Sequence, residues 1–384
     1  MTKKSDAPAI RFKGFSDAWE QRKAKEICSI GTGKSNTQDQ VDDGKYPFYI
    51  RSDVPVRSNK YLYDCEAVIT IGDGNIGKVF HYVNGKFDLH QRCYKMTDFK
   101  DIWGKYFFYY FSTKFYDRAM KMTAKATVDS VRLEMISEMD IKKPPQISEQ
   151  KQIAEFFANL DNLITLHQRK FEKLTNVKKS MLEKMFPQNG SSYPEIRFKG
   201  FTDPWEQRKF SELVQIERGG SPRPIDDFIT DAPNGLNWVK IGDAPTQGNY
   251  ITKTAEKIRP EGLSKTREVH PGDLILSNSM SFGKPYIMGI DGCIHDGWLL
   301  IRNTYGVFDL TFLCHLLGTP QMLSQYRSLA AGSTVNNLNK ELVGNTYVTI
   351  PSITEQRVLG AYLEQLDNLI TLHQRELYKH LRYR

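Results

Sequence analysis

Basic and amide side chains gather beside predicted turns in both halves of the chain, and their chemistry suits contacts with a nucleic acid. Arginine and lysine bind guanine edges or phosphates, and asparagine can pair with adenine, whereas the alternative is a set of solvated surface charges. The candidates in the first half are Lys34, Ser35, Asn36, Arg51, Lys78 and Arg92. The candidates in the second half are Arg223, Lys240, Asn278, Ser281 and Lys284.

Several segments resemble catalytic motifs in their letters but not in their chemistry. Gly72–Gly77 matches the dinucleotide fingerprint, yet it leads into a predicted strand rather than into a phosphate-facing helix. Gly33–Ser35 resembles the end of a P-loop, but Cys28 stands where that loop requires a glycine. Cys293–Asp296 lacks the spacing of a zinc site. We therefore predict no catalytic residues and no metal ligands in this chain.

Composition limits the class of protein. The chain has 384 residues, of which 40% are hydrophobic, so it is long enough for two domains with their own cores. A formal charge of +8 permits an anionic partner. We expect a cytoplasmic protein without membrane contact, because the sequence has no apolar N-terminal segment and no uncharged apolar run of about 18 residues. The five scattered cysteines suit free thiols.

Two repeats divide the chain into matching halves. Ile10–Lys23 returns with few changes as Ile196–Lys209, and Leu160–Arg169 returns letter for letter as Leu366–Arg375. The number of residues between the start segment and the helix segment is larger in the second half than in the first. The pattern indicates an internal duplication, with the order globular domain, helix, globular domain, helix.

The identical stretches lie in two long segments that we predict to be helices. Ser148–Gln150 and Thr354–Gln356 open them, and each hydroxyl is expected to be the N-cap, with the following carboxylate suiting the positive end of the helix. Apolar residues then follow in alternating steps of four and three, which is typical of a helix–helix seam. The predicted seam positions are Leu160, Ile164, His167, Phe171, Leu366, Ile370, His373 and Leu377.

The order of the elements predicts how these helices pair. The first helix leaves domain one and reaches domain two, so the second must return along it in an antiparallel coiled coil. Packing of each helix on its own domain is the alternative. A pseudo-two-fold axis through the pair would bring His167 close to His373. The apolar end Met181–Phe186 is expected to be covered by the second domain, near Phe198–Trp205, with a partner subunit as the alternative cover.

The remaining elements predict an α+β fold for each globular half. The predicted strands are Ala67–Ile71, Val79–Val83, Trp238–Ile241, Asp273–Leu276 and Trp298–Ile301. The predicted helices run from Trp103 to about Met120, from Asp309 to Leu317, and onward from Gln321. The predicted domains are 1–146, a central helix 147–186, a linker 187–194, a second domain 195–352 and a C-terminal helix 353–384.

These motifs resemble a known family over essentially the whole chain. The repeated starts Phe12–Lys23 and Phe198–Lys209, the turn Ile71–Lys78 and the duplicated helices are similar to those of the DNA-specificity subunit of type I restriction-modification systems. The resemblance implies that each globular half is a target-recognition domain for one part of a two-part asymmetric site on double-stranded DNA. It also implies that the helices set the spacer and dock two adenine-methyltransferase subunits, which restriction subunits then join.

The resemblance places the cofactors outside this chain. S-adenosylmethionine would be bound by the methyltransferase subunits, and ATP and Mg²⁺ by the restriction subunits, so this subunit would be non-catalytic. One departure from the pattern is that the second helix stops at Arg384, and we expect the partner of Val177–Phe186 to lie beyond it. The other readings are a structural coiled-coil scaffold and a fused DNA-modifying enzyme.

Overall fold

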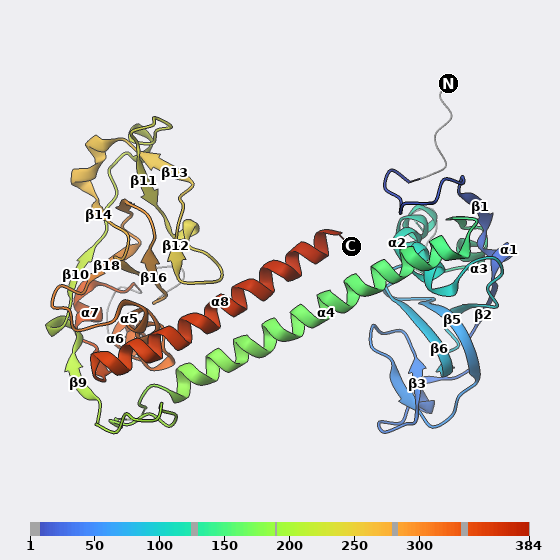
Figure 1. Ribbon diagram of the computed structural model, residues 1–384, viewed down its shortest axis with the longest axis horizontal. Coiled ribbons are helices and arrows are strands. Elements are labelled where there is room, and N and C mark those ends of the chain that lie inside the picture. Colours follow the sequence, from blue (N-terminus) through green and yellow to red (C-terminus); the bar gives the residue numbers. More distant parts are fainter. Residues whose placement is uncertain (1–7, 124–129, 189, 279–282, 332–336, 384) are drawn as a thin grey trace. The chain divides into compact units, whose positions relative to one another are not determined.

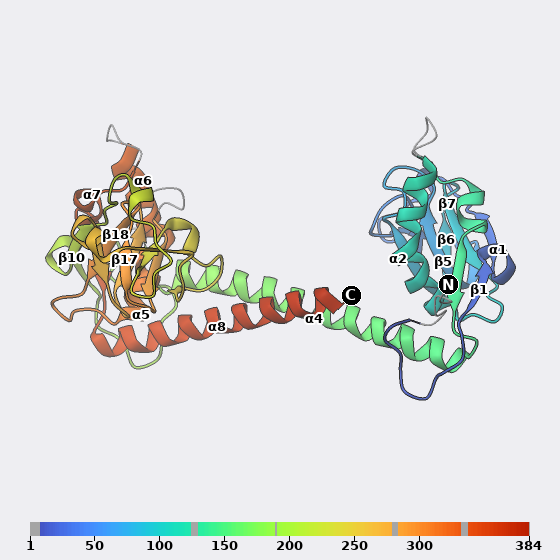
Figure 2. The same cartoon turned by 90° about the horizontal axis from the view of Figure 1, so that it is seen from above.

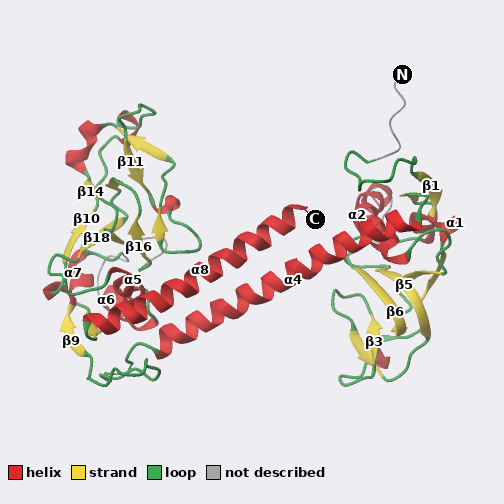
Figure 3. Cartoon of the chain, in the orientation of Figure 1, coloured by secondary structure: helices red, strands yellow, loops and turns green. Residues whose placement is uncertain are grey.

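The computed structural model describes residues 8–123, 130–188, 190–278, 283–331 and 337–383 (Figure 1). The chain forms two compact units, one ending at residue 162 and the other spanning residues 163–383. Both units mix strands with helices, as the colouring in Figure 3 shows. The predicted α+β duplication with two long helices is confirmed.

The first unit is built on a six-stranded sheet with the order β2-β7-β5-β6-β3-β4, in which β3 and β6 are parallel and the other neighbours antiparallel. One face of the sheet packs against α2, through Phe107, Phe111 and Phe115. The elements are β1 (Glu20–Lys23), α1 (Ala24–Ile27), β2 (Ser29–Thr32), β3 (Tyr46–Tyr49), β4 (Val56–Ser58), β5 (Tyr63–Ile71), β6 (Phe80–Leu89), β7 (Cys93–Thr97), α2 (Gly104–Thr123), α3 (Leu133–Ser137) and β8 (Asp140–Lys143). Helix α4 (Ile147–Lys184) begins in this unit and ends in the second.

The second unit divides the corresponding strands between two sheets. Their orders are β10-β18-β15-β16-β12 and β13-β11-β17-β14. The strands are β9 (Glu206–Lys209), β10 (Gln215–Arg218), β11 (Leu236–Val239), β12 (Tyr250–Ile251), β13 (Glu256–Ile258), β14 (Arg267–Val269), β15 (Leu274–Ser277), β16 (Pro285–Met288), β17 (Gly292–Ile294), β18 (Trp298–Arg302) and β19 (Tyr347–Ile350). The helices are α5 (Leu310–Leu317), α6 (Pro320–Ala331), α7 (Lys340–Gly344) and α8 (Ile353–Tyr383).

The predicted strands and helices correspond to elements of the structure, with differences in length. Strands β5 and β6 extend well beyond the predicted Ala67–Ile71 and Val79–Val83. The strand predicted for Trp238–Ile241 ends at Val239. The physical reason is a local turn: the Asp243 carboxylate accepts a hydrogen bond from the Lys240 backbone N–H at 2.8 Å, which starts a short 3-10 helix. A polar side chain three residues ahead therefore ends the strand.

The repeated Glu-Gln-Arg-Lys segments form equivalent edge strands. β1 pairs with β8 in the first unit, and β9 pairs with β19 in the second, both antiparallel. Each of these two-stranded sheets joins the start of a domain to the strand that leads into its long helix. The repeat in the sequence is therefore also a repeat in the structure.

A buried ion pair ties the start of each domain to the first turn of its long helix. In the first unit, Arg11 donates to both carboxylate oxygens of Glu149, at 2.6 and 2.7 Å. In the second unit, Arg197 binds Glu355 in the same way, at 2.7 and 2.8 Å. Both carboxylate side chains are at most 4% exposed. The two-point geometry fixes direction as well as distance.

The glutamine that follows each glutamate joins the same helix turn to the rest of its domain. The side-chain oxygen of Gln150 accepts from the backbone N–H of Trp103, and its amide donates to the carbonyl of Pro144. Gln356 accepts from the Asp309 N–H and donates to the carbonyl of Pro351. Because both glutamines are buried, these bonds satisfy amide groups that water cannot reach.

The predicted N-caps were wrong by two residues. Helix α4 begins at Ile147 and α8 at Ile353, so Ser148 and Thr354 lie inside the first turns. In α8 the capping hydroxyl is that of Ser352, which accepts from the Glu355 N–H at 3.4 Å. The carboxylates of Glu149 and Glu355 were predicted to interact with the positive ends of the helices. In the structure they form ion pairs with Arg11 and Arg197.

Within the second unit, α8 packs along the later part of α4, as the two views in Figures 1 and 2 agree. The Nδ1 atoms of His167 and His373 lie 3.0 Å apart, in the predicted register. Ile164 and Ile370 are buried, while Phe171 and Leu377 are half-buried. Leu160, in the part of α4 that belongs to the first unit, is also buried.

Asp367, inside the duplicated stretch, joins three helices of the second unit and the loop before β12. Its carboxylate forms an ion pair with Lys178 of α4 and accepts from the Asn249 side-chain amide at 2.7 Å. Nε2 of His315 in α5 lies 3.7 Å from the same carboxylate. The contact with Asp367 gives Lys178 an ionic partner at the largely apolar interface between the two helices.

The expectation that Val177–Phe186 pairs beyond Arg384 was wrong. That expectation assumed that positions related by the internal duplication also contact each other in the helix pair. In an antiparallel pair the end of α4 instead meets the start of α8, and Val177 packs in the same apolar cluster as Leu363. The predicted covering of the apolar end is confirmed, since the Phe186 ring lies 6.0 Å from Trp205 and 5.7 Å from Phe312, centroid to centroid.

Two general features complete the fold. All five cysteines are free, and burial raises the pKa of the Cys28 and Cys93 thiols to about 12, so these thiols stay protonated. In the part of the chain that the structure describes, no helix is both long enough and apolar enough to cross a bilayer.

Removing the arginine of one buried ion pair should destabilise the fold strongly. We expect Arg197→Ala to cost about 3–5 kcal/mol in urea denaturation of the full chain, because Glu355 would be left buried without its cation. Lys184→Ala is the matched control, since its partner Glu195 is exposed and such pairs contribute about 1 kcal/mol or less. Equal losses of stability in the two variants would contradict the strongly stabilising role given to the buried Arg197–Glu355 pair.

His315 should make the second unit sensitive to acid. Burial, together with the charge of Lys178, lowers the pKa of His315 to about 4, against an unfolded value of about 6.5. The folded state therefore holds the neutral ring, and its stabilisation is complete above about pH 6.5 and is lost as the pH falls toward about 4. Between pH 6.5 and 5 the loss should be roughly 2 kcal/mol.

Urea denaturation at several pH values measures this effect, with His315→Gln expected to flatten the acid limb of the stability curve. His270→Gln is the control of opposite sign, because the hydrogen bond to Asp291 raises the pKa of the exposed His270 ring. A His315→Gln variant as acid-sensitive as the parent would show that other groups cause the loss.

Candidate nucleic-acid interface

Each domain carries a hollow at the same topological position, beside a glycine loop that follows its first main-sheet strand. A Cβ atom at Gly33 would lie 2.2 Å from the Leu89 carbonyl oxygen, and one at Gly219 would lie 2.2 Å from that of His295. Only glycine lets these loops approach the neighbouring strand so closely. Residues further along the same loops, Thr37 in the first domain and Ser221 in the second, line the two hollows.

Matching backbone bonds establish that the two positions correspond. The His90 N–H donates to the Tyr49 carbonyl, and the His295 N–H donates to the Val239 carbonyl. In both cases Nδ1 of the histidine then accepts the backbone N–H two residues later, at 3.1 Å in the first domain and 2.8 Å in the second. The histidines thus shape the same turn and need a neutral Nδ1 to do so.

The hollow of the first domain has a volume of about 370 Å³ and an arginine-rich rim. Its lining residues are Thr37, Ile50, Arg51, Asp73, Gly74, Asn75 and His90. Nη1 of Arg51 lies 3.1 Å from both carboxylate oxygens of Asp73, and Nη1 of Arg92 lies 2.8 Å from one of them. Two guanidinium groups from separate loops therefore converge on one carboxylate.

The electrostatics of this rim are consistent with the geometry. Partial burial alone would raise the pKa of the Asp73 carboxyl, but hydrogen bonds from Arg92 and Arg51 lower it overall. Burial lowers the pKa of His90, and the two nearby arginines lower it further. An ionised Asp73 and a neutral His90 leave the rim with a net positive charge, which suits an anionic ligand.

The hollow of the second domain is larger, about 1130 Å³, and is built from different side chains. Its lining residues are Ser221, Pro222, Arg223, Pro224, Ile225, Asp226, Ile229, Trp238, Lys240, Glu256, His295 and Asp296. Asp296 accepts from the Ser221 hydroxyl at 3.0 Å and lies 3.5 Å from Arg223. The Arg223 side chain is 81% exposed, so most of its donors face water.

Five of the predicted interface residues lie at these two rims. Arg51, Arg92, Arg223 and Lys240 are described above, and Lys240 also forms an ion pair with Glu256. The Asn36 side-chain oxygen accepts from the Gln91 amide at 2.6 Å, next to Arg92. The exposed Lys34 lies in the glycine loop itself.

Two other candidates are turned inward by the fold. Ser35 is 2% exposed, and its hydroxyl donates to the buried carboxylate of Asp88 at 2.6 Å. Asn278 is 3% exposed and donates to the Asp296 carbonyl at 2.9 Å. Their chemistry is used to hold the loops together. The sequence could not distinguish an inward amide or hydroxyl from an outward one.

The predicted turn lysines, Lys78 and Lys284, are not among the residues that line the two hollows. Lys78 follows the turn after β5, and its Nζ lies 5.5 Å from the centroid of the Tyr116 ring. Nζ of Lys284 lies 5.0 Å from the Tyr286 ring. Both ammonium groups therefore rest against aromatic faces. Ser281 lies outside the described residues.

Sequence reasoning missed the acidic and histidine residues at the rims. Asp73 and Asp296 hold the arginines, and His90 and His295 hold the turns, yet acidic residues are not expected in a surface for an anion. The duplication in the sequence could have pointed to the two histidines, because each follows a buried strand residue at an equivalent place in its domain. Among the described residues, no three His, Cys, Asp or Glu side chains come together as a metal site.

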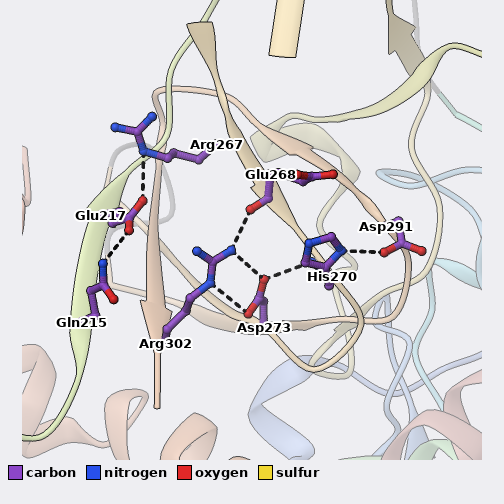
Figure 4. Close-up of polar contacts among 8 residues, drawn as sticks. All are labelled: Gln215, Glu217, Arg267, Glu268, His270, Asp273, Asp291 and Arg302. Atoms are coloured by element: carbon purple, nitrogen blue, oxygen red, sulfur yellow. Dashed lines mark hydrogen bonds and ion pairs between the residues drawn. The ribbon is translucent and has the colours of Figure 1, made fainter. Parts of the chain in front are cut away.

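A second polar cluster in the second domain has the wrong charge for a DNA surface (Figure 4). Arg302 contacts Asp273, whose carboxylate also accepts from the backbone N–H of His270 at 3.0 Å. Arg267 pairs with Glu217 at 3.0 Å. The residues drawn in Figure 4 include four carboxylates and only two arginines, so this network stabilises the sheet edge rather than offering free cations.

The duplicated domains, the paired helices and the arginine-bearing hollow in each domain define a DNA-binding specificity module. The family described as "Type I restriction modification DNA specificity domain" matches residues 16–176 and again residues 202–382. The chain therefore belongs to this family, and its two globular halves are target-recognition domains.

Known proteins support this assignment over nearly the whole chain. The chain is 24% identical to the type I restriction enzyme MjaVIII specificity subunit of Methanocaldococcus jannaschii, covering 93% of this chain and 88% of that one. It is 22% identical to the EcoDI specificity subunit of Escherichia coli, covering 91% and 81%. The fold resembles the crystal structure of the S subunit from M. genitalium, with a TM-score of 0.67 at 13% identity, covering 98% and 96%.

Substitution at the second rim should weaken DNA binding. We expect Arg223→Ala to raise the dissociation constant for the cognate duplex about tenfold, because an exposed guanidinium on the rim would lose its contact with base or phosphate. Titrations at several salt concentrations would distinguish a base contact from a phosphate contact, since loss of a phosphate contact lowers the salt slope by about one. Arg208→Ala, on β9 and paired with Glu206 and Glu212, is the matched control. Equal affinities for both variants would remove this rim from the interface.

Proposed function

We propose that this chain reads a two-part asymmetric DNA site and thereby directs adenine methylation and restriction by partner subunits. The observation that carries the proposal is the pair of equivalent hollows, one in each target-recognition domain, with arginine on both rims. One hollow would read each half-site. Phosphate contacts around the rims would set the register, and side chains in the hollows would read base edges.

The difference between the two hollows supports an asymmetric site. The first rim carries Arg51 and Arg92 around Asp73, whereas the second carries Arg223 and Lys240 with Asp296 and Glu256. The volumes also differ, at about 370 and 1130 Å³. Two domains with the same frame and different reading side chains should prefer different base sequences.

An apolar stripe on the paired helices supports docking of two like subunits. Leu163 and Leu166 of α4 are 38% and 45% exposed, and their duplicates Leu369 and Leu372 of α8 are 43% and 50% exposed. Large apolar side chains repeated in equivalent places suit two copies of one partner. We propose that two methyltransferase subunits bind here, with restriction subunits joining that core.

The catalytic chemistry would belong to those partners. S-adenosylmethionine would be held by the methyltransferase subunits, and ATP with Mg²⁺ by the restriction subunits. A fused DNA-modifying enzyme would instead turn over substrate as the purified chain alone. A structural scaffold would bind cognate and scrambled duplexes equally, and it leaves two differently lined hollows without a purpose.

Methylome sequencing tests the proposal directly. Cells that express this chain with its methyltransferase subunit should carry methyladenine in one two-part motif, and cells that lack this chain should not. The Arg223→Ala variant should lower methylation without creating methylation at unrelated sites. Methylation at the same motif in cells without this chain would overturn the proposed function.

The length of the paired helices should set the spacer between half-sites. Inserting four residues after Arg169 and four after Arg375 lengthens the pair by about 6 Å and rotates its ends by about 400°, close to a whole turn, so packing should survive. At about 3.4 Å per base pair, the preferred spacer should grow by one or two base pairs.

Methylation of duplexes whose spacer varies one base pair at a time measures this shift. Two-residue insertions at the same places are the control, because they rotate the ends by about 200° and should abolish activity. An active four-residue variant that keeps the original spacer would refute the role of helix length.

A further inference from the structure

We propose that Asp73 holds Arg51 and Arg92 as a paired reader of guanine, which makes this carboxylate a specificity-determining residue of the first target-recognition domain. The inference rests on the proposed function and names the base that this domain selects. The half-site read by the first domain should then contain a G·C pair whose recognition depends on Asp73. Asp73 acts as a positioning residue, and the arginines make the contact.

The contacts to Asp73 leave the useful edges of both guanidinium groups available. Only Nη1 of Arg51 and Nη1 of Arg92 take part in these bonds. The Nε and Nη2 donors on the other edge of each group can therefore form the two parallel bonds that match O6 and N7 of guanine. The arginine side chains are 43% and 60% exposed, whereas Asp73 is 23% exposed. The carboxylate lies beneath the two cations.

The backbone around Asp73 and Arg92 is fixed by bonds that do not depend on DNA. The Gly72 N–H donates to the Arg92 carbonyl at 2.7 Å, which joins the loop of Asp73 to the loop of Arg92. The Arg92 N–H donates to Nδ1 of the buried His90. Asp73 itself forms a backbone bridge with Ser130. The ordering cost of an arginine pair is thus met before DNA binds, which favours selectivity.

The second domain shows that this arrangement is not part of the common frame. The positions that correspond to Arg51 and Arg92, two residues after Tyr49 and two after His90, are Ile241 and Gly297. Neither can donate a side-chain hydrogen bond. A feature needed for folding of the frame would be expected in both domains, whereas a feature that selects one base sequence would be expected in one.

The charge balance also favours reading over simple phosphate binding. Two arginines that only bound phosphate would gain nothing from a carboxylate between them, because it weakens attraction for an anion. Neutralising one of the two charges lowers nonspecific affinity and leaves directional hydrogen bonds as the main source of binding. Discrimination against wrong bases therefore rises relative to overall affinity.

The test compares Asp73→Asn with Asp140→Asn in the full chain. Both changes remove one negative charge from the first unit, but Asp140 pairs with Lys23 on the two-stranded sheet β1–β8. Competition binding uses the wild-type motif and all its single-base-pair variants. A photo-crosslinker at Thr37, which lines the hollow, identifies the half-site read by the first domain.

We expect Asp73→Asn to lose about tenfold or more discrimination at one G·C pair of that half-site, with nonspecific affinity equal or higher. Preferences in the other half-site, and every preference of Asp140→Asn, should be unchanged. Asp73→Glu keeps the charge and should restore part of the discrimination. The combined Arg51→Ala, Arg92→Ala variant should lose the same base preference.

Two outcomes would overturn the inference. An unchanged base profile for Asp73→Asn, or an equal loss of affinity for every duplex, would give Asp73 only a structural role. A double-arginine variant that keeps its base profile but binds all DNA with a smaller salt slope would make the pair a phosphate contact. Failure of the proposed function is a separate result, because the wild-type chain would then show no sequence preference.

Discussion

The two-point ion pair between an arginine near the start of each domain and a glutamate in the first turn of its long helix is the constraint on which the architecture depends. The Arg11–Glu149 and Arg197–Glu355 pairs fix the angle between the start of each domain and its long helix. The neighbouring glutamines extend this fixation to the strands and the helix of each domain. A long helix keeps a defined orientation relative to its domain only if its first turn is rigidly attached, and buried charge-assisted bonds supply that rigidity.

A polar contact plays the corresponding role between the paired helices. Apolar residues of the seam supply attraction, but they would tolerate sliding by a turn. Asp367, bound by Lys178 and Asn249, has no equivalent partners one turn away, so it specifies the alignment of α8 on α4. The contact between His167 and His373 marks the same alignment further along. Identical ten-residue stretches therefore serve both packing and register.

The sequence predicted the frame far better than the reading surface. Duplicated segments and helix periodicity depend on many residues at once, so the long helices, the strands around the central turn and the covering of Phe186 could be inferred. Whether a single polar side chain faces inward depends on one local bond. Ser35 and Asn278 were misplaced for this reason, and Asp73 escaped notice because an acid looks unsuitable beside DNA until its two arginine partners are visible.

The origin of the rims in separate loops has a consequence for how such a protein can change. Arg51, Arg92 and Arg223 each follow the end of a different strand, while the glycine loop and the histidine turn beneath them are shared by both domains. Substitutions on the rims can therefore alter binding preference without touching the hydrogen bonds that preserve the fold. New preferences can arise by small, independent steps in either domain, and the other domain retains its own throughout.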